Sequence, residues 1–170
     1  MKVMQAARTE RMVSVRPPAR VRPHPAMLAT ALSTLLIVAG CGEEPLPQAC
    51  LQADAGAVAR LLHAAPEDAT LSGGTPLSAC VDRAESDAEL QNLGIVFVAV
   101  ADRLVARSRH DARAAYELGF LIGAAERGAG PTGGVQGELV QRLQQTIAFN
   151  VTPAVQAEVE RGIAAGRTDG

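Results

Sequence analysis

The sequence predicts an all-α fold, a small bundle of about five or six helices. Apolar residues recur at three- and four-residue spacings through most of the chain after residue 54, as they do on the buried faces of helices. Residues typical of helix starts precede these stretches. No convincing pair of strands is predicted. Because the segments between the expected helices are short, consecutive helices are expected to pack antiparallel.

Capping residues and prolines mark the boundaries of the first two helices. Asp54 is a good N-cap for a helix over residues 55–65, which Pro66 ends. Thr75 and Pro76 have the residue types of an N-cap and a first helical position, where the missing amide proton of proline costs nothing.

The longest helix is expected over residues 87–107. Ser86 and Glu89 form a capping-box sequence at its start. The β-branched run 95–98 widens the apolar stripe, so we expect this helix to be the central one. The same run is compatible with a strand, but the helical spacing on both sides favours a helix. The residues at that spacing are Leu90, Leu93, Phe97, Val100 and Leu104.

Three more helices complete the expected bundle. Asp111 is a good N-cap for a helix over residues 112–127, and the next helix spans residues 135–149. Thr152-Pro153 starts the last helix, and the end of the chain over residues 166–170 is expected to fray.

Gly119 and Gly123 lie one turn apart in the helix expected over residues 112–127. In an exposed helix each would cost about 1 kcal/mol relative to alanine. We therefore expect these glycines to allow close contact with a neighbouring helix. A groove beside them that binds a small ligand is the alternative.

The first 40 residues have the pattern of a secretory signal. Three arginines within residues 16–22 precede the apolar stretch 27–40, and no acidic residue lies between Met12 and Cys41. The stretch is too short to span a bilayer, which takes about 20 residues. The start codon is open between Met1 and Met12.

The apolar stretch ends with Val38, Ala39, Gly40 and Cys41. This sequence resembles the lipobox of bacterial lipoprotein precursors. The resemblance implies cleavage before Cys41, a diacylglycerol on the Cys41 sulfur and often a further acyl chain, such as palmitate, on its amine. Two or more chains anchor a protein stably to a membrane. The mature protein is then expected on the extracytoplasmic side of a cell membrane, periplasmic or outer. An ordinary secretory signal with an incidental cysteine is the alternative.

The predicted segments are a signal peptide (residues 1–40), a lipidated tether (41–50), a helical domain (51–166) and a flexible tail (167–170). The signal peptide holds six of the 16 basic residues and one of the 18 acidic ones, so the mature chain has a net charge of −7 and no lysine. Since nucleic-acid binding needs a positive footprint, no nucleic-acid partner is expected. The lipid on Cys41, and not electrostatic attraction, is expected to hold the protein to the membrane.

Cys50 and Cys80 are the two cysteines that the lipid would not use. In an exported protein, such a pair favours a disulfide. Closing a loop of this length stabilises a fold by roughly 3–4 kcal/mol on chain-entropy grounds. A pair of buried free thiols is the alternative. A metal site is not expected at these cysteines, since no histidines cluster beside them.

No catalytic, cofactor-binding or metal-binding residues are predicted, because the sequence has no HExxH, GxSxG or P-loop motif. His63 and His110 are expected on the surface. The acidic residues of the segment 82–89 cluster around a helix start, where their charges interact favourably with the helix dipole.

Because no catalytic motif is found, we expect a non-enzymatic interaction or scaffolding module with an unknown envelope protein as partner. A small-ligand-binding helical domain is the alternative.

Residues 74–79 resemble the TPLHxA element of ankyrin repeats, with Ser78 in place of its histidine. Residues 54–62 resemble the second helix of such a repeat. Ankyrin arrays need three or more repeats, and no second TPL element follows. An ordinary start of an amphipathic helix is therefore the favoured interpretation.

Overall fold

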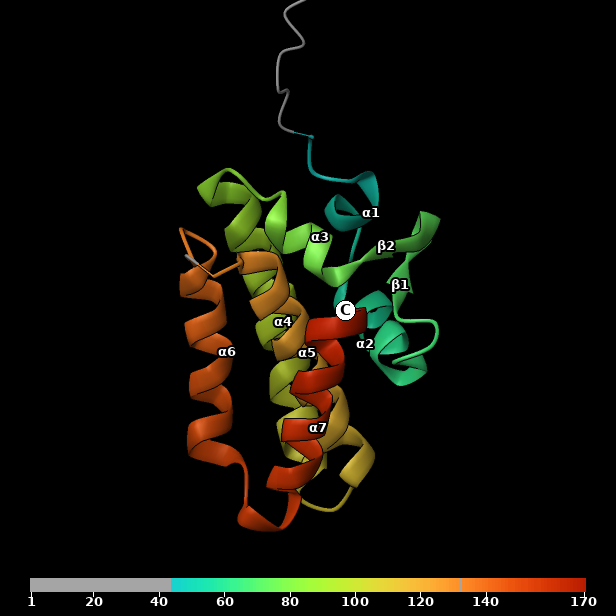
Figure 1. Ribbon diagram of the computed structural model, residues 1–170, viewed down its shortest axis with the longest axis vertical. Coiled ribbons are helices and arrows are strands. Elements are labelled where there is room, and N and C mark those ends of the chain that lie inside the picture. The colour runs from blue at the N-terminus through green and yellow to red at the C-terminus, as the bar shows by residue number, and fades with distance from the viewer. Residues whose placement is uncertain (1–43, 132) are drawn as a thin grey trace, which may run out of the picture. The chain divides into compact units, whose positions relative to one another are not determined.

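The computed structural model describes residues 44–131 and 133–170. The expected signal peptide and Cys41 lie outside the described residues. Within those residues the chain forms seven α-helices and one short two-stranded sheet, which confirms the predicted all-α fold (Figure 1). The helices are α1 (Gln48–Leu51), α2 (Ala55–Ala64), α3 (Leu77–Asp82), α4 (Asp87–Ser108), α5 (Ala112–Ala129), α6 (Gly137–Asn150) and α7 (Pro153–Asp169).

Two of the predicted helix starts are fixed by the capping side chains. Asp54 accepts a hydrogen bond from the amide of Ala57 at 2.6 Å, at the start of α2. Asp111 accepts one from the amide of Arg113 at 2.9 Å, at the start of α5. Each carboxylate thus satisfies an amide that has no partner inside its helix.

The helix predicted after Thr75-Pro76 is present as α3, but its predicted start is one residue too early, because Thr75 and Pro76 belong to a strand. They form β2 (Thr75–Pro76), which pairs antiparallel with β1 (Thr70–Leu71). Gly73 and Gly74 turn the chain between the strands with φ angles of 72° and 74°, a region that glycine enters without strain. The helix α3 therefore begins only after Pro76, and the expectation of no strand pair is corrected by this short hairpin.

The central helix is α5 and not α4, which corrects the expectation drawn from the β-branched run. α5 packs against α2, α3, α4, α6 and α7, with its most extensive interface on α7. Its residues 117–125 are all buried. On α4, by contrast, Ile95 is 64% exposed and Val98 is half-buried. Within the run, Ile95 and Val98 line a groove beside α6, whereas Phe97 is buried.

The end of the chain is docked and does not fray. α7 continues to Asp169, and Gly170 is buried. The hydroxyl of Ser78 on α3 donates to the oxygen of Gly170 at 2.5 Å. Arg127 on α5 donates to the carbonyl of Thr168 at 2.6 Å and to Gly170 at 3.2 Å. These partners satisfy backbone oxygens that the end of a helix leaves free.

Candidate functional site

The segment that follows the expected lipidation site is folded onto the helical domain from its first described residue. Glu44 forms an ion pair with Arg83, the residue after α3. Leu46 and Pro47 are half-buried. The amide of Cys50 donates to the carbonyl of Pro47 at 2.9 Å. Within the predicted tether, Leu46 and Ala49 thus pack against the core of the domain.

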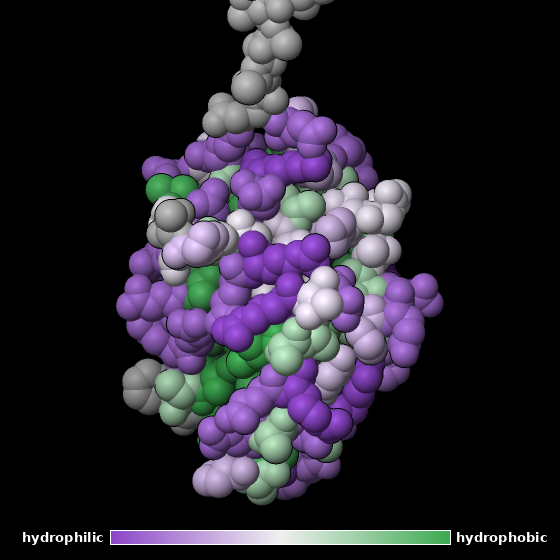
Figure 2. Space-filling view, viewed as in Figure 1, coloured by the Kyte–Doolittle hydropathy of each residue, from purple (hydrophilic) through white to green (hydrophobic). Residues whose placement is uncertain are grey.

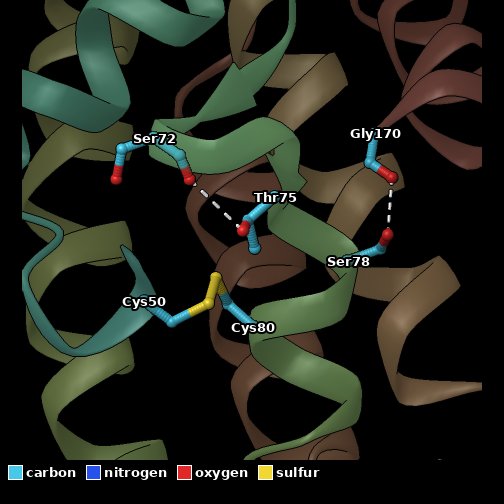
Figure 3. The surroundings of a disulfide bond; sticks show 6 residues. All are labelled: Cys50, Ser72, Thr75, Ser78, Cys80 and Gly170. Carbon is cyan, nitrogen blue, oxygen red and sulfur yellow. Dashed lines mark hydrogen bonds between the residues drawn. A yellow bond between two sulfur atoms is a disulfide. The ribbon is translucent and has the colours of Figure 1, made fainter. Parts of the chain in front are cut away.

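Cys50 and Cys80 form the predicted disulfide (Figure 3). Their Cα atoms lie 5.4 Å apart, across 30 residues of sequence, and both side chains are buried. The bond joins α1 to α3. Because both sulfurs are used, neither cysteine has a thiolate that could act as a nucleophile.

Two hydroxyl groups near the disulfide, those of Ser78 and Thr75, donate hydrogen bonds to backbone oxygens (Figure 3). Ser78, two residues before Cys80, donates to the oxygen of Gly170. Thr75 donates to the carbonyl of Ser72 within the hairpin turn at 3.4 Å. Both bonds hold backbone segments in place, so this region is a structural junction of α1, α3 and the C-terminus.

Gly119 and Gly123 contact the backbone of α7, as the spacing predicted. A Cβ built on Gly119 would collide with α7 and lie 2.9 Å from the nitrogen of Ile163. From the other side, a Cβ on Gly162 or Gly166 would lie 2.8 Å from a backbone nitrogen of α5. The two helices thus touch backbone to backbone. A ligand groove beside these glycines is excluded, because α7 fills that space.

A groove of about 1030 Å³ lies instead between α4 and α6. Ile95 and Val135 line it and are 64% and 56% exposed. Gly94 and Leu139 form part of its floor, where a Cβ on Gly94 would be 3.7 Å from the Leu139 side chain. Arg142 supplies a charge on the rim. An apolar lining with a few polar groups is typical of binding sites.

The opposite side of α6 also borders apolar surface. Figure 2 shows the face over α6 and α7, which is mostly hydrophilic but has a hydrophobic strip between the two helices. Half-buried apolar residues on these helices include Val140, Ile147 and Ile163. α6 makes its main contacts with α4 and α5. It is therefore flanked by the groove on one side and by the strip on the other.

Glu117 of α5 is a buried charge at the centre of a polar cluster. Its side chain is 2% exposed. Its Oε1 lies 3.0 Å from Nδ1 of His63 and 3.3 Å from Nε of Arg113, and its Oε2 lies 3.8 Å from Arg107. A buried carboxylate without partners would be costly. Here two guanidinium groups and an imidazole compensate for the lost hydration.

The cluster holds the end of α2 on α5. Arg113 donates to the carbonyl of His63 at 2.8 Å and to that of Ala65 at 2.6 Å. Carbonyls at a helix C-terminus have no partner inside the helix, and cations there also favour the dipole. His63 and His110 are exposed, as predicted, but the contact of His63 with Glu117 was not predicted. This arrangement gives the cluster a structural role.

Ser86 and Glu89 form the predicted capping box among the acidic residues at the start of α4. The hydroxyl of Ser86 accepts from the amide of Glu89 at 3.3 Å, and the Glu89 carboxylate accepts from the amide of Ser86 at 3.0 Å. Two hydrogen bonds from Ser86 keep the pKa of Glu89 below its ordinary value, the bond from the amide having the larger effect and the bond from the hydroxyl the next.

In the part of the chain that the structure describes, no group of three or more His, Cys, Asp or Glu side chains could hold a metal ion.

Glu117 is the residue that sequence reasoning overlooked. It lies among Ala114, Leu118 and Leu121, which are all buried, so an acid at this position falls within the apolar stripe of α5. It also follows Arg113 by four residues, the spacing of an ion pair on a helix. Together these two signals mark a buried, paired carboxylate.

The fold and the cysteine pair define a small all-α domain with a disulfide between α1 and α3. No protein-family model, curated protein or solved structure matches the chain. No helix of residues 44–131 and 133–170 is long and apolar enough to cross a membrane.

Proposed function

We propose that the protein is a lipoprotein of the cell envelope, with a signal peptide over residues 1–40 and lipid on Cys41. The disulfide supports this proposal most directly, because Cys50 is only nine residues beyond Cys41. Disulfides form and persist in oxidising compartments and are rare in the cytosol. The lipobox-like sequence and the Cys50–Cys80 bond thus favour the same extracytoplasmic location independently of each other.

The helical domain of this lipoprotein is an interaction or scaffolding module for an envelope protein. Three large hydrophobic side chains are well exposed among the described residues, and two of them, Ile95 and Val135, line the groove between α4 and α6. Exposed apolar patches with polar rims mark interaction sites. The groove is therefore the surface at which we expect the partner protein to bind.

The second candidate function is the binding of a small ligand in the same groove. Its volume of about 1030 Å³ is at the upper end of ligand pockets, which measure roughly 300–1,000 Å³. Gln91 and Arg142 in the lining would orient polar groups of such a ligand.

Lipidation is tested by the variant Cys41→Ser in the native host. We expect the native protein to incorporate a labelled fatty acid and to give an N-terminal peptide that begins with modified Cys41. The variant is expected to remain an unprocessed precursor or to be released without lipid. An unmodified Cys41 inside a continuous chain of the native protein would refute the lipoprotein proposal.

The interaction role is tested with a photo-crosslinking amino acid at Ile95 in the groove. The matched control is Glu160, an exposed residue of α7 outside the groove lining. We expect the same protein adduct in repeated experiments from position 95 and not from position 160. Absence of any protein adduct, together with a small molecule that co-purifies and blocks labelling at position 95, would favour the ligand-binding alternative.

A further inference from the structure

The segment that follows the proposed lipidation site is attached to the domain at α1. Glu44 is held by its ion pair with Arg83, and Cys50 is held by the disulfide to Cys80. Between them, Pro47 is half-buried, and its carbonyl accepts a hydrogen bond from the amide of Cys50. The disulfide therefore holds α1 on the domain, whereas the ion pair of Glu44 is exposed and contributes little to stability.

The sequence between Cys41 and the first described residue is short compared with the domain. Only three peptide steps separate Cys41 from Glu44. At 3.3–3.6 Å per residue, they reach at most about 11 Å. A domain of this length has a radius of gyration of about 14 Å. A lipid on Cys41 therefore keeps the start of the described domain within about 11 Å of the bilayer.

The end of the domain near the tether presents an apolar side chain. Leu51 of α1 is 57% exposed, although most large hydrophobic residues of the domain are buried. Figure 1 shows α1 and the connection between α6 and α7 at opposite ends of the described domain. Electrostatic attraction to anionic lipid is not expected to set the orientation, since the mature chain is acidic and has no lysine.

We infer that the α1 end of the domain rests on the lipid bilayer, with Leu51 in contact with the boundary between head groups and acyl chains. This inference rests on the proposed lipidation of Cys41. It makes the bilayer the partner of the α1 surface, and it points the α6–α7 connection away from the membrane. An apolar side chain that enters this boundary is favoured by the hydrophobic effect, while the covalent lipid keeps it within reach.

The experiment uses tryptophan fluorescence, because the chain has no tryptophan of its own. Leu51→Trp reports on α1, and Ala154→Trp, at an exposed position at the start of α7, is the matched control. The lipidated proteins are reconstituted into phosphatidylcholine vesicles with brominated acyl chains. We expect the tryptophan at position 51 to be quenched about twofold or more relative to the one at position 154, and its emission to shift to the blue. Equal quenching, or stronger quenching at position 154, would overturn the inference.

A longer tether tests the cause of this orientation. We insert about ten Gly and Ser residues between Glu43 and Glu44 in the Leu51→Trp protein, which gives a flexible spacer of increased reach. The lipidated variant should still float with the vesicles but lose most of its extra quenching. Unchanged quenching would show that the short tether does not set the orientation.

Two control measurements separate this inference from the proposed function. Flotation with vesicles and the mass of the N-terminal peptide report whether Cys41 carries lipid. If Cys41 is unmodified, the lipoprotein proposal and the inference both fail. If the protein is lipidated and floats, but positions 51 and 154 are quenched alike, only the inference fails.

Discussion

Gly123 of α5 lies directly against the backbone of Ile163 in α7. A Cβ at Gly123 would be 2.9 Å from the carbonyl carbon of Ile163 and 2.9 Å from the nitrogen of Arg167. Gly119, one turn before Gly123 on α5, lies in the same way against Val159 and Ile163, which are one turn before Ile163 and Arg167 on α7. The two helices therefore run parallel, and the contact holds the C-terminal helix against the central one.

The variant Gly123→Ala should lower the free energy of unfolding by about 1–3 kcal/mol, because the added methyl group must push two backbones apart. Chemical denaturation monitored by circular dichroism measures the change. The matched control is Gly137→Ala in α6, where a Cβ would meet no atom within 4 Å. That variant should be neutral or slightly stabilising, since alanine favours helix over glycine. A Gly123→Ala protein as stable as the control would contradict the close contact.

The variant Glu117→Gln should lower the free energy of unfolding by about 1.5–3 kcal/mol, because Arg113 and Arg107 lose their buried counter-charge while the side-chain volume is kept. The control is Glu138→Gln, which breaks an ion pair with Arg142 whose two side chains are each 64% exposed. Exposed pairs contribute at most about 1 kcal/mol. Urea denaturation at neutral pH compares the two variants. Equal effects would argue against a structural role for the cluster.

The capping box at Ser86 should make part of the stability depend on pH. Hydrogen bonds from the Ser86 amide and then its hydroxyl hold the pKa of Glu89 below its ordinary value of 4.5. A carboxylate with a lowered pKa in the folded state stabilises the fold above the pKa of the unfolded state, and this contribution is lost as pH falls through the folded value. The stability difference between the wild type and Glu89→Gln should therefore be largest near neutral pH and shrink below about pH 4.5.

Urea unfolding curves at a series of pH values measure this difference. Asp111 also has a lowered pKa, chiefly because of its hydrogen bond with Arg107, but it is present in both proteins and cancels in the comparison. A difference that stays constant from neutral to acidic pH would show that the Glu89 carboxylate does not contribute through its charge.

Local signals in the sequence predicted most helices, because a cap depends on residues close together in the chain. Asp54 and Asp111 start helices by bonding amides two or three residues away. The disulfide was also predictable, because the first 40 residues have the pattern of a secretory signal and a pair of cysteines in an exported protein favours a disulfide. Thr75-Pro76 shows where local reasoning stops. The same residue types suit a helix start and an edge strand, and pairing with β1 decided between them.

The remaining differences depend on contacts that are distant in sequence. The C-terminus is docked because Gly170 accepts from Ser78, a residue 92 positions away. α5 is central because its small residues admit α7, and two residues of the apolar run of α4, Ile95 and Val98, instead line a groove beside α6. Neither fact can be read from the periodicity of one helix. The lipobox-like sequence at Cys41 lies outside the described residues and stays a prediction.

Replacing both Cys50 and Cys80 by alanine should lower the free energy of unfolding by roughly 3–4 kcal/mol, because the unfolded chain gains freedom. Against a total stability of about 5–15 kcal/mol, this should lower the melting temperature by about 10 °C or more. Calorimetry of the native and double-variant proteins measures the change. A melting temperature unchanged within a few degrees would mean that the bridge contributes little.

Hydrogen exchange of the same double variant should show where the protection is lost. The amides of α1 should exchange faster, because this four-residue helix is joined to α3 by the disulfide. The amides of α5 should stay protected longest, since residues 117–125 are buried, α5 packs against five other helices, and this packing does not need the bridge. If instead α4 outlasted α5, the central position of α5 would be wrong, and the helix first expected from the sequence would be the stable core.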